Sequence, residues 1–352
     1  MSGIEASEFG TAPDGARVQA FTLTSAGGAR VRILDFGGIV VSLELPDRDG
    51  RLGDVVLGHA TLEGYFADTT YLGALIGRVA NRIGSARFTL DGNDYPLLAN
   101  NGPHHLHGGP DGFHRRRWRA EASTLEGGVA LRLERESPDG EEGYPGTLRA
   151  EVTYTLGDDA SLGIDYAAVT DAPTPVNLTH HSYFDLSAGT APDVLGHRLT
   201  LHADAFLPTD TTQIPTGDVR AVEGTPFDFR EPSAIGARLD APDEQLRAAG
   251  GYDHHYVIRG WDGGLREAAR VVEPRSGRVL QLLTTERGLQ FYSGNQLSGA
   301  RGKGGRRHAP RTGFCLEAQG YPNAPNEPAF PPVVLRPGER YRQRTVYRFW
   351  AA

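Results

Sequence analysis

Cysteine is almost absent from this sequence. Cys315 is the only cysteine among 352 residues, so no internal disulfide framework can form. A chain without disulfides suits a reducing compartment. The first ten residues, MSGIEASEFG, contain neither the basic nor the apolar segment of a secretory leader, and no apolar run approaches the ~20 residues that span a bilayer. We therefore expect a soluble, cytoplasmic protein that does not bind a membrane.

Positive charge is also in short supply. The net charge is −8 and the isoelectric point is about 5.8. A nucleic-acid partner requires a strong positive field, so we expect none. The one basic stretch, residues 301–308 (RGKGGRRH), is interpreted as a mobile surface loop.

Long helical patterns are few, and the 46 glycines and 23 prolines favour short strands and turns. Period-two alternation of apolar and polar residues predicts strands over residues 127–137, 148–156, 162–166 and 341–350. Turn clusters lie at residues 91–94 and 137–140. Helices are expected only at residues 71–82 and 243–249.

The order of these elements shows no alternation of strand and helix, no fixed repeat and no low-complexity linker. Antiparallel sheets stacked face to face therefore fit better than a parallel α/β sheet. We predict an all-β fold, a single large antiparallel β-sandwich with few short helices, in which residues 1–352 form one domain.

Histidines gather in a few polar clusters. Seven of the 12 histidines lie in them: His104, His105, His107, His180, His181, His254 and His255. Neighbouring side chains on a strand point to opposite faces, so only one of His180 and His181 can reach a given cleft. The same holds for the pair at 254 and 255, whereas His105 and His107 could share a face. Four histidines are interpreted as hydrogen-bonded turn or core residues: His104, His114, His202 and His308.

Motifs for metals, cofactors and covalent catalysis are missing. A zinc site would need three or four ligands from separate segments, because the chain has no H-E-x-x-H and no paired cysteines. It also lacks G-x-S-x-G, the Walker sequence and a G-x-G-x-x-G that opens a helix. We expect no metal and no cofactor, and we interpret Cys315 as a buried structural thiol.

Glu317 lies in an apolar run, residues 314–317 (FCLE), that is typical of a strand. Desolvation would raise the pKa of this carboxyl and make it a base near neutrality. A histidine can supply the matching acid, because its ordinary pKa is near 6.5. An equally good interpretation from spacing alone is a strand-edge glutamate paired with an arginine.

Several motifs taken together resemble the galactose mutarotases, the aldose 1-epimerases. The segments that carry the resemblance run in family order: 81–83 (NRI), 100–109 (NNGPHHLHGG), 143–146 (GYPG), 176–186 (VNLTHHSYFDL), 251–254 (GYDH), 288–295 (GLQFYSGN), 313–319 (GFCLEAQ), and 322–326 (PNAPN) with 335–338 (LRPG). Each is modest alone, but the ordered set is specific. The resemblance implies a large β-sandwich that interconverts the anomers of free hexoses such as galactose or glucose.

The resemblance also implies roles for individual residues. Glu317 corresponds to the general base of the family, and His181 corresponds to the general acid. Residues implied to hold the sugar are Asn81, Arg82, His107, Asp253 and Gln290. Two positions depart from the family pattern: Asp185 replaces the usual Asn and Ala318 the usual Thr, which puts the sugar preference in doubt.

Three other functions stay open at this point. A non-catalytic carbohydrate-binding β-sandwich would keep Arg82 and Asp253 without needing an acid–base pair. An epimerase of hexose 6-phosphates would need a basic pocket, for which residues 301–311 are the candidate. A glycosidase would use Asp253 and Glu317 as its carboxylate pair. The partner in each case is a small sugar, and the chain is expected to be a monomer or a homodimer.

Overall fold

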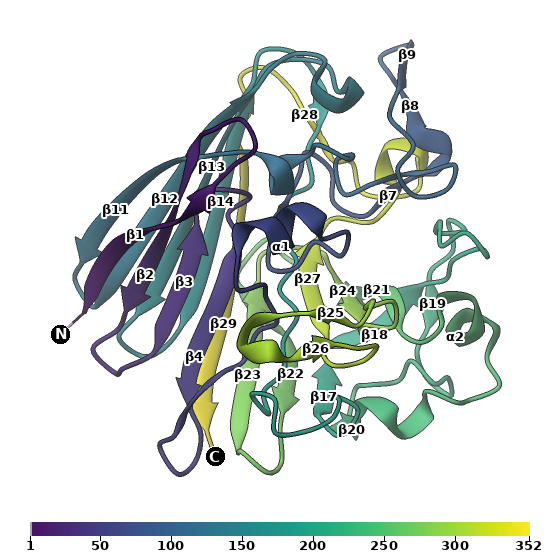
Figure 1. Cartoon of the computed structure of the whole chain (residues 1–352). Coiled ribbons are helices and arrows are strands. Elements are labelled where there is room, and N and C mark those ends of the chain that lie inside the picture. The colour runs from purple at the N-terminus through teal and green to yellow at the C-terminus, as the bar shows by residue number, and fades with distance from the viewer. Residues whose placement is uncertain (1) are drawn as a thin grey trace.

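Alternating apolar and polar residues form the longest strands of the structure, a computed structural model that describes residues 2–352 (Figure 1). β13 (Leu148–Gly157) buries Leu148, Val152 and Tyr154 on one face, as its sequence pattern predicts. The predicted strands at 127–137, 162–166 and 341–350 are confirmed as β12 (Gly128–Ser137), β14 (Leu162–Thr170) and β29 (Tyr341–Ala351).

These strands belong to a nine-stranded antiparallel sheet within residues 2–352. In spatial order it comprises β11 (Arg119–Leu125), β12, β13, β14, β29, β23 (Arg278–Thr284), β22 (Arg266–Val272), β17 (Arg198–Leu201) and β20 (Ser233–Ala234). The C-terminal β29 pairs with β14 on one side and β23 on the other. The last strand of the chain therefore joins the two halves of the sheet.

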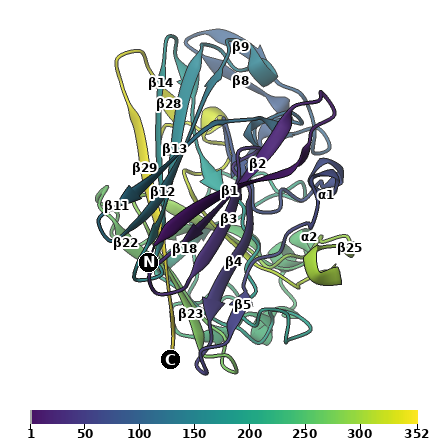
Figure 2. The ribbon, with the colours of Figure 1, turned by 60° about the vertical axis from the view of Figure 1, so that its left-hand side comes forward.

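A second sheet is formed by the N-terminal strands, which pair in sequence order. They are β1 (Gly3–Thr11), β2 (Arg17–Thr24), β3 (Arg30–Leu34), β4 (Val40–Pro46) and β5 (Leu52–Asp54). Figures 1 and 2 show this purple sheet lying across the teal strands of the nine-stranded sheet, with β2 against β12 and β4 against β29. The two sheets form stacked layers, as expected of a sandwich.

A third sheet carries the residues of interest for function. Its order is β19 (Arg220–Ala221), β18 (Ala203–Leu207), β21 (Asp253–Ile258), β24 (Gly288–Tyr292) and β27 (Cys315–Gln319). β24 and β27 are buried along their whole length. A single apolar cluster includes Val31 of the second sheet, Tyr154 of the nine-stranded sheet and Leu316 of the third. Because one core connects all three sheets, the third sheet has a rigid support.

Short two-stranded ribbons connect the large sheets. They are β6 (Leu75–Ile76) with β16 (Thr179–His180), β7 (Arg82–Ile83) with β10 (His105–Leu106), β8 (Arg87–Leu90) with β9 (Asn93–Pro96), β15 (Thr174–Pro175) with β28 (Val334–Leu335), and β25 (Ala300–Arg301) with β26 (Arg307–His308). The predicted turns at 91–94 and 137–140 are confirmed, because the first joins β8 to β9 and the second follows β12.

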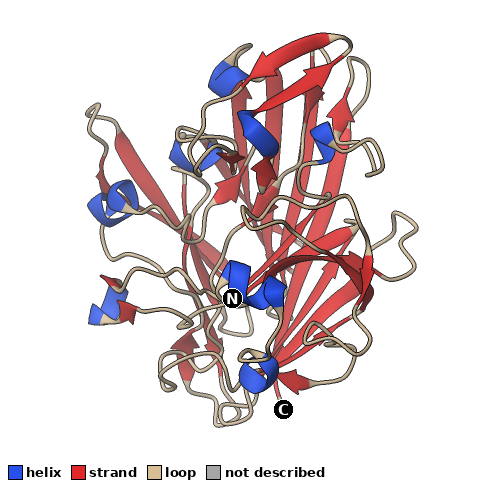
Figure 3. Cartoon of the chain, turned by 90° about the vertical axis from the view of Figure 1, so that its right-hand side faces the viewer, coloured by secondary structure: helices blue, strands red, loops and turns tan. Residues whose placement is uncertain are grey.

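Helices are short and lie on the connections, as Figure 3 shows. Residues 2–352 contain α1 (Leu62–Ala67), α2 (Glu244–Ala249) and the 3₁₀ turns η1 (Gly84–Ala86), η2 (Phe113–Arg115), η3 (Glu141–Gly143), η4 (Ile235–Arg238), η5 (Lys303–Gly305) and η6 (Ala324–Asn326). Within residues 2–352, none of them is long and apolar enough to cross a membrane. The predicted helix at 243–249 is confirmed: the Asp243 carboxylate caps its first turn, and Gly250 ends it in the left-handed conformation.

The helix predicted at residues 71–82 is wrong. This segment forms β6, a turn and the start of β7. Tyr71, Gly73 and Asn81 have φ values of 59°, 67° and 59°. A right-handed helix cannot contain positive φ, so the segment is extended and bent. The all-β prediction is confirmed, whereas the single-domain organisation stays a prediction.

Candidate active site

Three neighbouring strands of the third sheet bring Asp253, Gln290 and Glu317 to the same face. Gln290 on β24 is the direct partner of Glu317 on β27, and Asp253 on β21 pairs with Tyr292, two residues along β24. Directly paired residues of antiparallel strands point the same way. The Gln290 amide donates to Asp253 Oδ1 at 2.7 Å. Gln290 itself does not line the pocket formed here, so it orients Asp253 from behind.

The opposite wall comes from the ribbon of β7 and β10. Asn81 and His107 flank this ribbon and both have left-handed backbones, with φ of 59° and 52°. The backbone N–H of Asn81 donates to His107 Nδ1 at 3.1 Å. A neutral His107 ring therefore carries its proton on Nε2 and presents an N–H donor to the pocket.

The left-handed turn at His107 also overturns one expectation. His105 and His107 do not share a face, because positive φ interrupts the strand alternation after Leu106. His105 is buried away from the pocket and bonds the Leu98 carbonyl and the Tyr144 hydroxyl. Only His107 of this pair lines the pocket.

Arg82 is held by acceptors from separate loops. Its Nε donates to Asn101 Oδ1 at 2.9 Å, its Nη2 donates to Gln213 Oε1, and its Nη1 lies 4.0 Å from Asp253 Oδ2. This arrangement fixes the guanidinium before a substrate arrives, which lowers the entropy cost of binding. Sequence reasoning missed Gln213, because nothing in residues 208–216 suggests a contact with Arg82.

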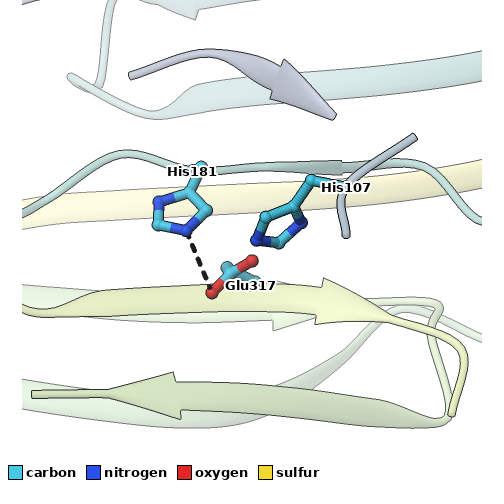
Figure 4. A group of neighbouring side chains, drawn as sticks. All are labelled: His107, His181 and Glu317. Carbon is cyan, nitrogen blue, oxygen red and sulfur yellow. Dashed lines mark ion pairs between the residues drawn. The ribbon is translucent and has the colours of Figure 1, made fainter. Parts of the chain in front are cut away.

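His181 follows β16 directly and enters the pocket above β27 (Figure 4). Its backbone N–H donates to the Ala74 carbonyl at 2.9 Å, and its Nε2 lies 3.7 Å from Glu317 Oε1. Figure 4 shows the His181 and His107 rings side by side over the Glu317 carboxyl. His180 lies outside the pocket and is buried against Tyr154. This placement agrees with strand alternation, which directs only one of the two adjacent side chains into the cleft.

Burial controls the charge of both groups. Desolvation, with a smaller contribution from the Asp253 charge, raises the pKa of Glu317 well above its usual range, while Arg82 opposes the shift. Desolvation lowers the pKa of His181 to about 4. Both shifts disfavour the ion pair, so Glu317 and His181 together hold one proton at a pH between the lowered pKa of His181 and the raised pKa of Glu317. Glu317 Oε2 is buried and has no hydrogen-bond partner within residues 2–352.

These residues line one pocket with a volume of about 400 Å³. Six of the seven residues predicted from the sequence line it, and only Gln290 does not. The six are Asn81, Arg82, His107, His181, Asp253 and Glu317. Sequence reasoning missed further lining residues, which include Tyr71, Asn101, His114, Arg115 and Tyr292. Asn101 lies within the NNGPHHLHGG segment, which was a usable signal. His114 is buried, as expected of a core histidine, but it also faces the pocket.

Of three aromatic side chains near the site, one lines the pocket and two belong to the apolar core. Tyr183 lines the pocket beside His181, with ring centroids 5.0 Å apart. Phe184 and Phe291 lie in the main apolar core instead. Cys315 is fully buried, and its Sγ lies 3.5 Å from His181 Nδ1. Burial raises the pKa of this thiol well above its usual range, so it is neutral and a poor nucleophile.

His107, His181 and Glu317 each offer one ligand atom, and these atoms lie within 4.8 Å of one another. Two imidazoles and a carboxylate match a catalytic zinc site in number and type. Two of these residues, His181 and Glu317, are also the predicted acid and base. That the site holds no metal stays a prediction.

The basic stretch at 301–308 does not contribute to the pocket. It forms β25, η5 and β26, with Lys303 Nζ 2.6 Å from Asp54 Oδ2 and Arg306 paired with Asp185. Two of its cations are therefore neutralised by partners in the protein, and none of its residues lines the pocket. The structure gives the proposed phosphate pocket no support. His308 is buried within this segment, which is more tightly anchored than a free loop.

The two departures from the family pattern lie outside the pocket. Asp185 is buried, accepts the backbone N–H groups of Ser187 and Gly189, and pairs with Arg306. Ala318 points away from the Glu317 face, because neighbouring strand residues alternate. Neither departure changes a group that lines the site.

Comparison with known proteins agrees with this geometry. A family model described as aldose 1-epimerase matches residues 19–348. The chain is 46% identical to the galactose mutarotases of Bos taurus and Homo sapiens over 354 aligned positions, covering 100% of each chain. It is 40% identical to the aldose 1-epimerase of Escherichia coli (strain K12), with 97% of each chain covered.

Solved structures show the same fold. A crystal structure of an aldose epimerase homologue from C. elegans superimposes with a TM-score of 0.85 at 31% identity, and the alignment covers 100% of both chains. The crystal structure of galactose 1-epimerase from Lactobacillus acidophilus gives a TM-score of 0.87 at 25% identity, again over 100% of both chains. The similarity therefore extends over the complete sandwich and includes every segment that forms the pocket.

Proposed function

Because this chain belongs to the aldose 1-epimerase family, we propose that it interconverts the α and β anomers of free aldoses, such as galactose and glucose, with Glu317 as base and His181 as acid. The observation that supports these roles is the buried Glu317 carboxyl, whose Oε2 has no hydrogen-bond partner within residues 2–352 and whose Oε1 faces His181 Nε2. Once the proton of the pair lies on His181, the Glu317 carboxylate can receive a proton from a substrate hydroxyl.

Anomer exchange requires two proton movements and one bond cleavage. Glu317 removes the proton of the anomeric hydroxyl, the bond between C1 and the ring oxygen breaks, and His181 donates a proton to that oxygen. The open aldehyde turns about its C1–C2 bond. On reclosure His181 takes the proton back from the attacking hydroxyl and Glu317 returns a proton to the new anomeric oxygen. The reaction is an isomerisation, and it consumes no co-reactant.

The shared proton fits this cycle. The free pair holds one proton, which burial keeps nearer Glu317. Moving it to His181 gives the form that reacts, and the total charge of the site does not change. Sugar hydroxyls that donate to Glu317 would favour this ionised form, because hydrogen bonds to a carboxylate stabilise its charge.

The remaining polar groups of the pocket would hold the sugar. Arg82 and Asp253 offer a fixed donor and acceptor for ring hydroxyls, and charge-assisted hydrogen bonds of this kind are the stronger ones. His107 offers its Nε2–H near His181. Asn81 orients His107, and Gln290 orients Asp253.

The test is the substitution Glu317→Gln, followed by polarimetry on freshly dissolved α-galactose and α-glucose. Removing a positioned base should lower kcat about 10²–10⁴-fold while the fold is retained. Glu267→Gln is the matched control, because Glu267 forms its contacts with Arg270 and Gln281 outside the pocket. A Glu317→Gln enzyme with wild-type rate would remove Glu317 from the mechanism.

Three other outcomes would point to the alternative functions. Release of sugar from an aryl glycoside would favour a glycosidase, and binding without any anomerisation would favour a carbohydrate-binding sandwich. Competition by glucose 6-phosphate would reveal acceptance of phosphorylated sugars. We propose a role in galactose and hexose metabolism in the cytoplasm, with the enzyme acting as a monomer or homodimer.

A further inference from the structure

His114 is a pocket residue that the proposed reaction does not use. It lies in η2 and is buried, yet it lines the same pocket as Glu317. Its Nδ1 is buried without a hydrogen-bond partner in residues 2–352. Burial lowers the pKa of His114 to about 3, so the ring is neutral and offers one donor and one acceptor. A buried ring nitrogen without a partner is costly, and such groups usually have a reason.

The position of His114 relative to the reacting groups follows from a row of rings. Its ring stacks edge-on against Tyr71 with centroids 4.7 Å apart, and Tyr71 lies 6.0 Å from the His181 ring. The Tyr71 ring thus connects His114 to the acid, whereas Arg82 and Asp253 contact each other, with Nη1 4.0 Å from Oδ2, and Asp253 accepts from Gln290. His114 therefore lies on the His181 side of Glu317, and Arg82 with Asp253 lies on the other.

The geometry of a pyranose assigns its parts to these two sides. The anomeric carbon has the ring oxygen as one neighbour and C2 as the other. If Glu317 faces the anomeric hydroxyl and His181 faces the ring oxygen, then C5 lies beyond the ring oxygen on the His181 side. The substituent of C5, a hydroxymethyl group in hexoses and a hydrogen in pentoses, extends toward Tyr71 and His114. The hydroxyls of C2 and C3 extend toward Arg82 and Asp253.

We propose that His114 hydrogen-bonds the C6 hydroxyl of a hexopyranose and thereby favours hexoses over pentoses. This inference rests on the proposed function, because it takes the sugar orientation from the roles of Glu317 and His181. Because Nδ1 is buried, a sugar in the pocket would bond Nε2, and a primary hydroxyl, which both donates and accepts, can do so in either tautomer. A sugar without this hydroxyl would leave the ring without a partner, and sites built around a hydrogen bond discriminate against such analogues.

The experiment compares three sugars that differ only at this position. D-galactose carries the hydroxymethyl group, D-fucose has a methyl group in its place, and L-arabinose has neither carbon nor hydroxyl there. With wild-type enzyme we expect kcat/KM for D-galactose to exceed that for D-fucose by about tenfold, the effect of one hydrogen bond. His114→Phe keeps a ring against Tyr71 but has no nitrogen. It should lower kcat/KM for D-galactose to the D-fucose value and leave D-fucose and L-arabinose unchanged.

Two further variants make the result specific. His114→Gln retains a donor and an acceptor and should keep part of the preference for D-galactose. His308→Phe is the matched control, since His308 is also buried with an unpartnered Nδ1 within residues 2–352 but does not line the pocket. It should leave all three ratios unchanged.

The outcomes separate this inference from the proposed function. Equal rate losses for all three sugars in His114→Phe would overturn the role of His114 while the reaction stands. A wild-type enzyme that does not distinguish D-galactose from D-fucose would overturn it as well, even if no variant folds. A wild-type protein without activity on any of the three sugars would instead overturn the proposed function itself.

Discussion

His181 Nε2 and Glu317 Oε1 lie 3.7 Å apart in a buried pocket, although the two residues are 136 positions apart in the sequence. The other ring nitrogen of His181 faces Cys315 Sγ at 3.5 Å. Burial keeps this thiol neutral, so the contact holds the ring in place without adding a charge next to it. The ring is thus held with Nε2 directed at Glu317.

Substituting each member of the adjacent histidine pair gives the first prediction. His181→Asn should lower kcat about 10²–10⁴-fold, because a positioned acid is lost. His180→Asn is the matched change one residue away, on a side chain buried against Tyr154 outside the pocket. It should leave kcat near the wild-type value and lower the thermal unfolding midpoint instead. Polarimetry and thermal unfolding of both variants check this, and similar losses of kcat in the two would contradict it.

The pH dependence of kcat/KM is the second prediction. The reactive pair holds one proton, so activity should fall in acid when a second proton binds, near the His181 pKa of about 4. It should fall in alkali when the single proton is lost, at the raised pKa of Glu317. The Asp253 charge contributes to that raised value, so Asp253→Asn should lower the pKa of Glu317 and move the alkaline limb to lower pH.

The spontaneous rate must be subtracted at each pH, because acid and base also catalyse anomerisation in solution. Asp253→Asn should weaken substrate binding as well, but a lower kcat/KM alone does not move a limb along the pH axis. An alkaline limb that stays in place or moves to higher pH in this variant would disprove the electrostatic coupling of Asp253 to Glu317.

Tyr71 gives the third prediction. Its backbone has φ of 59°, and its ring lies 4.7 Å from the His107 ring and 6.0 Å from the His181 ring. The Asp68 carboxylate accepts the N–H groups of Thr70 and Leu72 on either side and holds this strained turn. Strained residues of this kind often serve a site. Tyr71 is therefore a positioning residue for the two histidine rings.

Removing the ring should affect kcat more than KM. Tyr71→Leu should lower kcat about tenfold, since small displacements of catalytic groups have effects of this size or larger. Tyr71→Phe should restore the wild-type rate, because the only hydrogen bond of the hydroxyl within residues 2–352 is a long one from Asn100 Nδ2, at 3.4 Å. Steady-state kinetics on D-galactose separate the two parameters. A Tyr71→Phe enzyme as slow as Tyr71→Leu would show that the hydroxyl, and not the ring, is required.

The sequence predicted those strands well in which one face is buried and the other is exposed to solvent. The alternation in β13 is a direct consequence of that environment, so it can be read without coordinates. Residues 71–82 failed for the opposite reason. Leu72, Leu75, Ile76 and Val79 have helical spacing and are all buried, but the turn at Tyr71 and Gly73 makes the segment extended. The spacing of apolar residues indicates which side chains are buried. In a short segment it does not determine whether the backbone is helical or extended.

The site divides in a similar way. Glu317 and His181 lie in segments whose residue types suggest proton transfer, and strand alternation limits which histidine can reach the cleft. Gln213 and His114 carry no such signal, because their contacts with Arg82 and Tyr71 depend on how distant loops pack. Polar groups that act through tertiary contacts are therefore the part of the site that the sequence does not reveal.

Gly108 gives the fourth prediction, which concerns the loop that positions His107. Gly108 has φ of 80°, and a Cβ atom there would lie 1.9 Å from the Gly77 carbonyl oxygen. Gly102 in the same segment also has a positive φ, 57°, but a Cβ atom there would meet nothing within 4 Å. The two glycines therefore share the conformational requirement and differ in the space around them.

Gly102→Ala should cost only the strain of a left-handed alanine, about 1 kcal/mol of unfolding free energy. Gly108→Ala should cost about 3–5 kcal/mol, because the backbone must also move away from Gly77. That movement displaces His107, so kcat on D-galactose should fall as well, whereas Gly102→Ala should keep its rate. Urea denaturation and polarimetry measure the two effects. Equal losses of stability in the two variants would mean that the close approach of residues 108 and 77 does not constrain the loop.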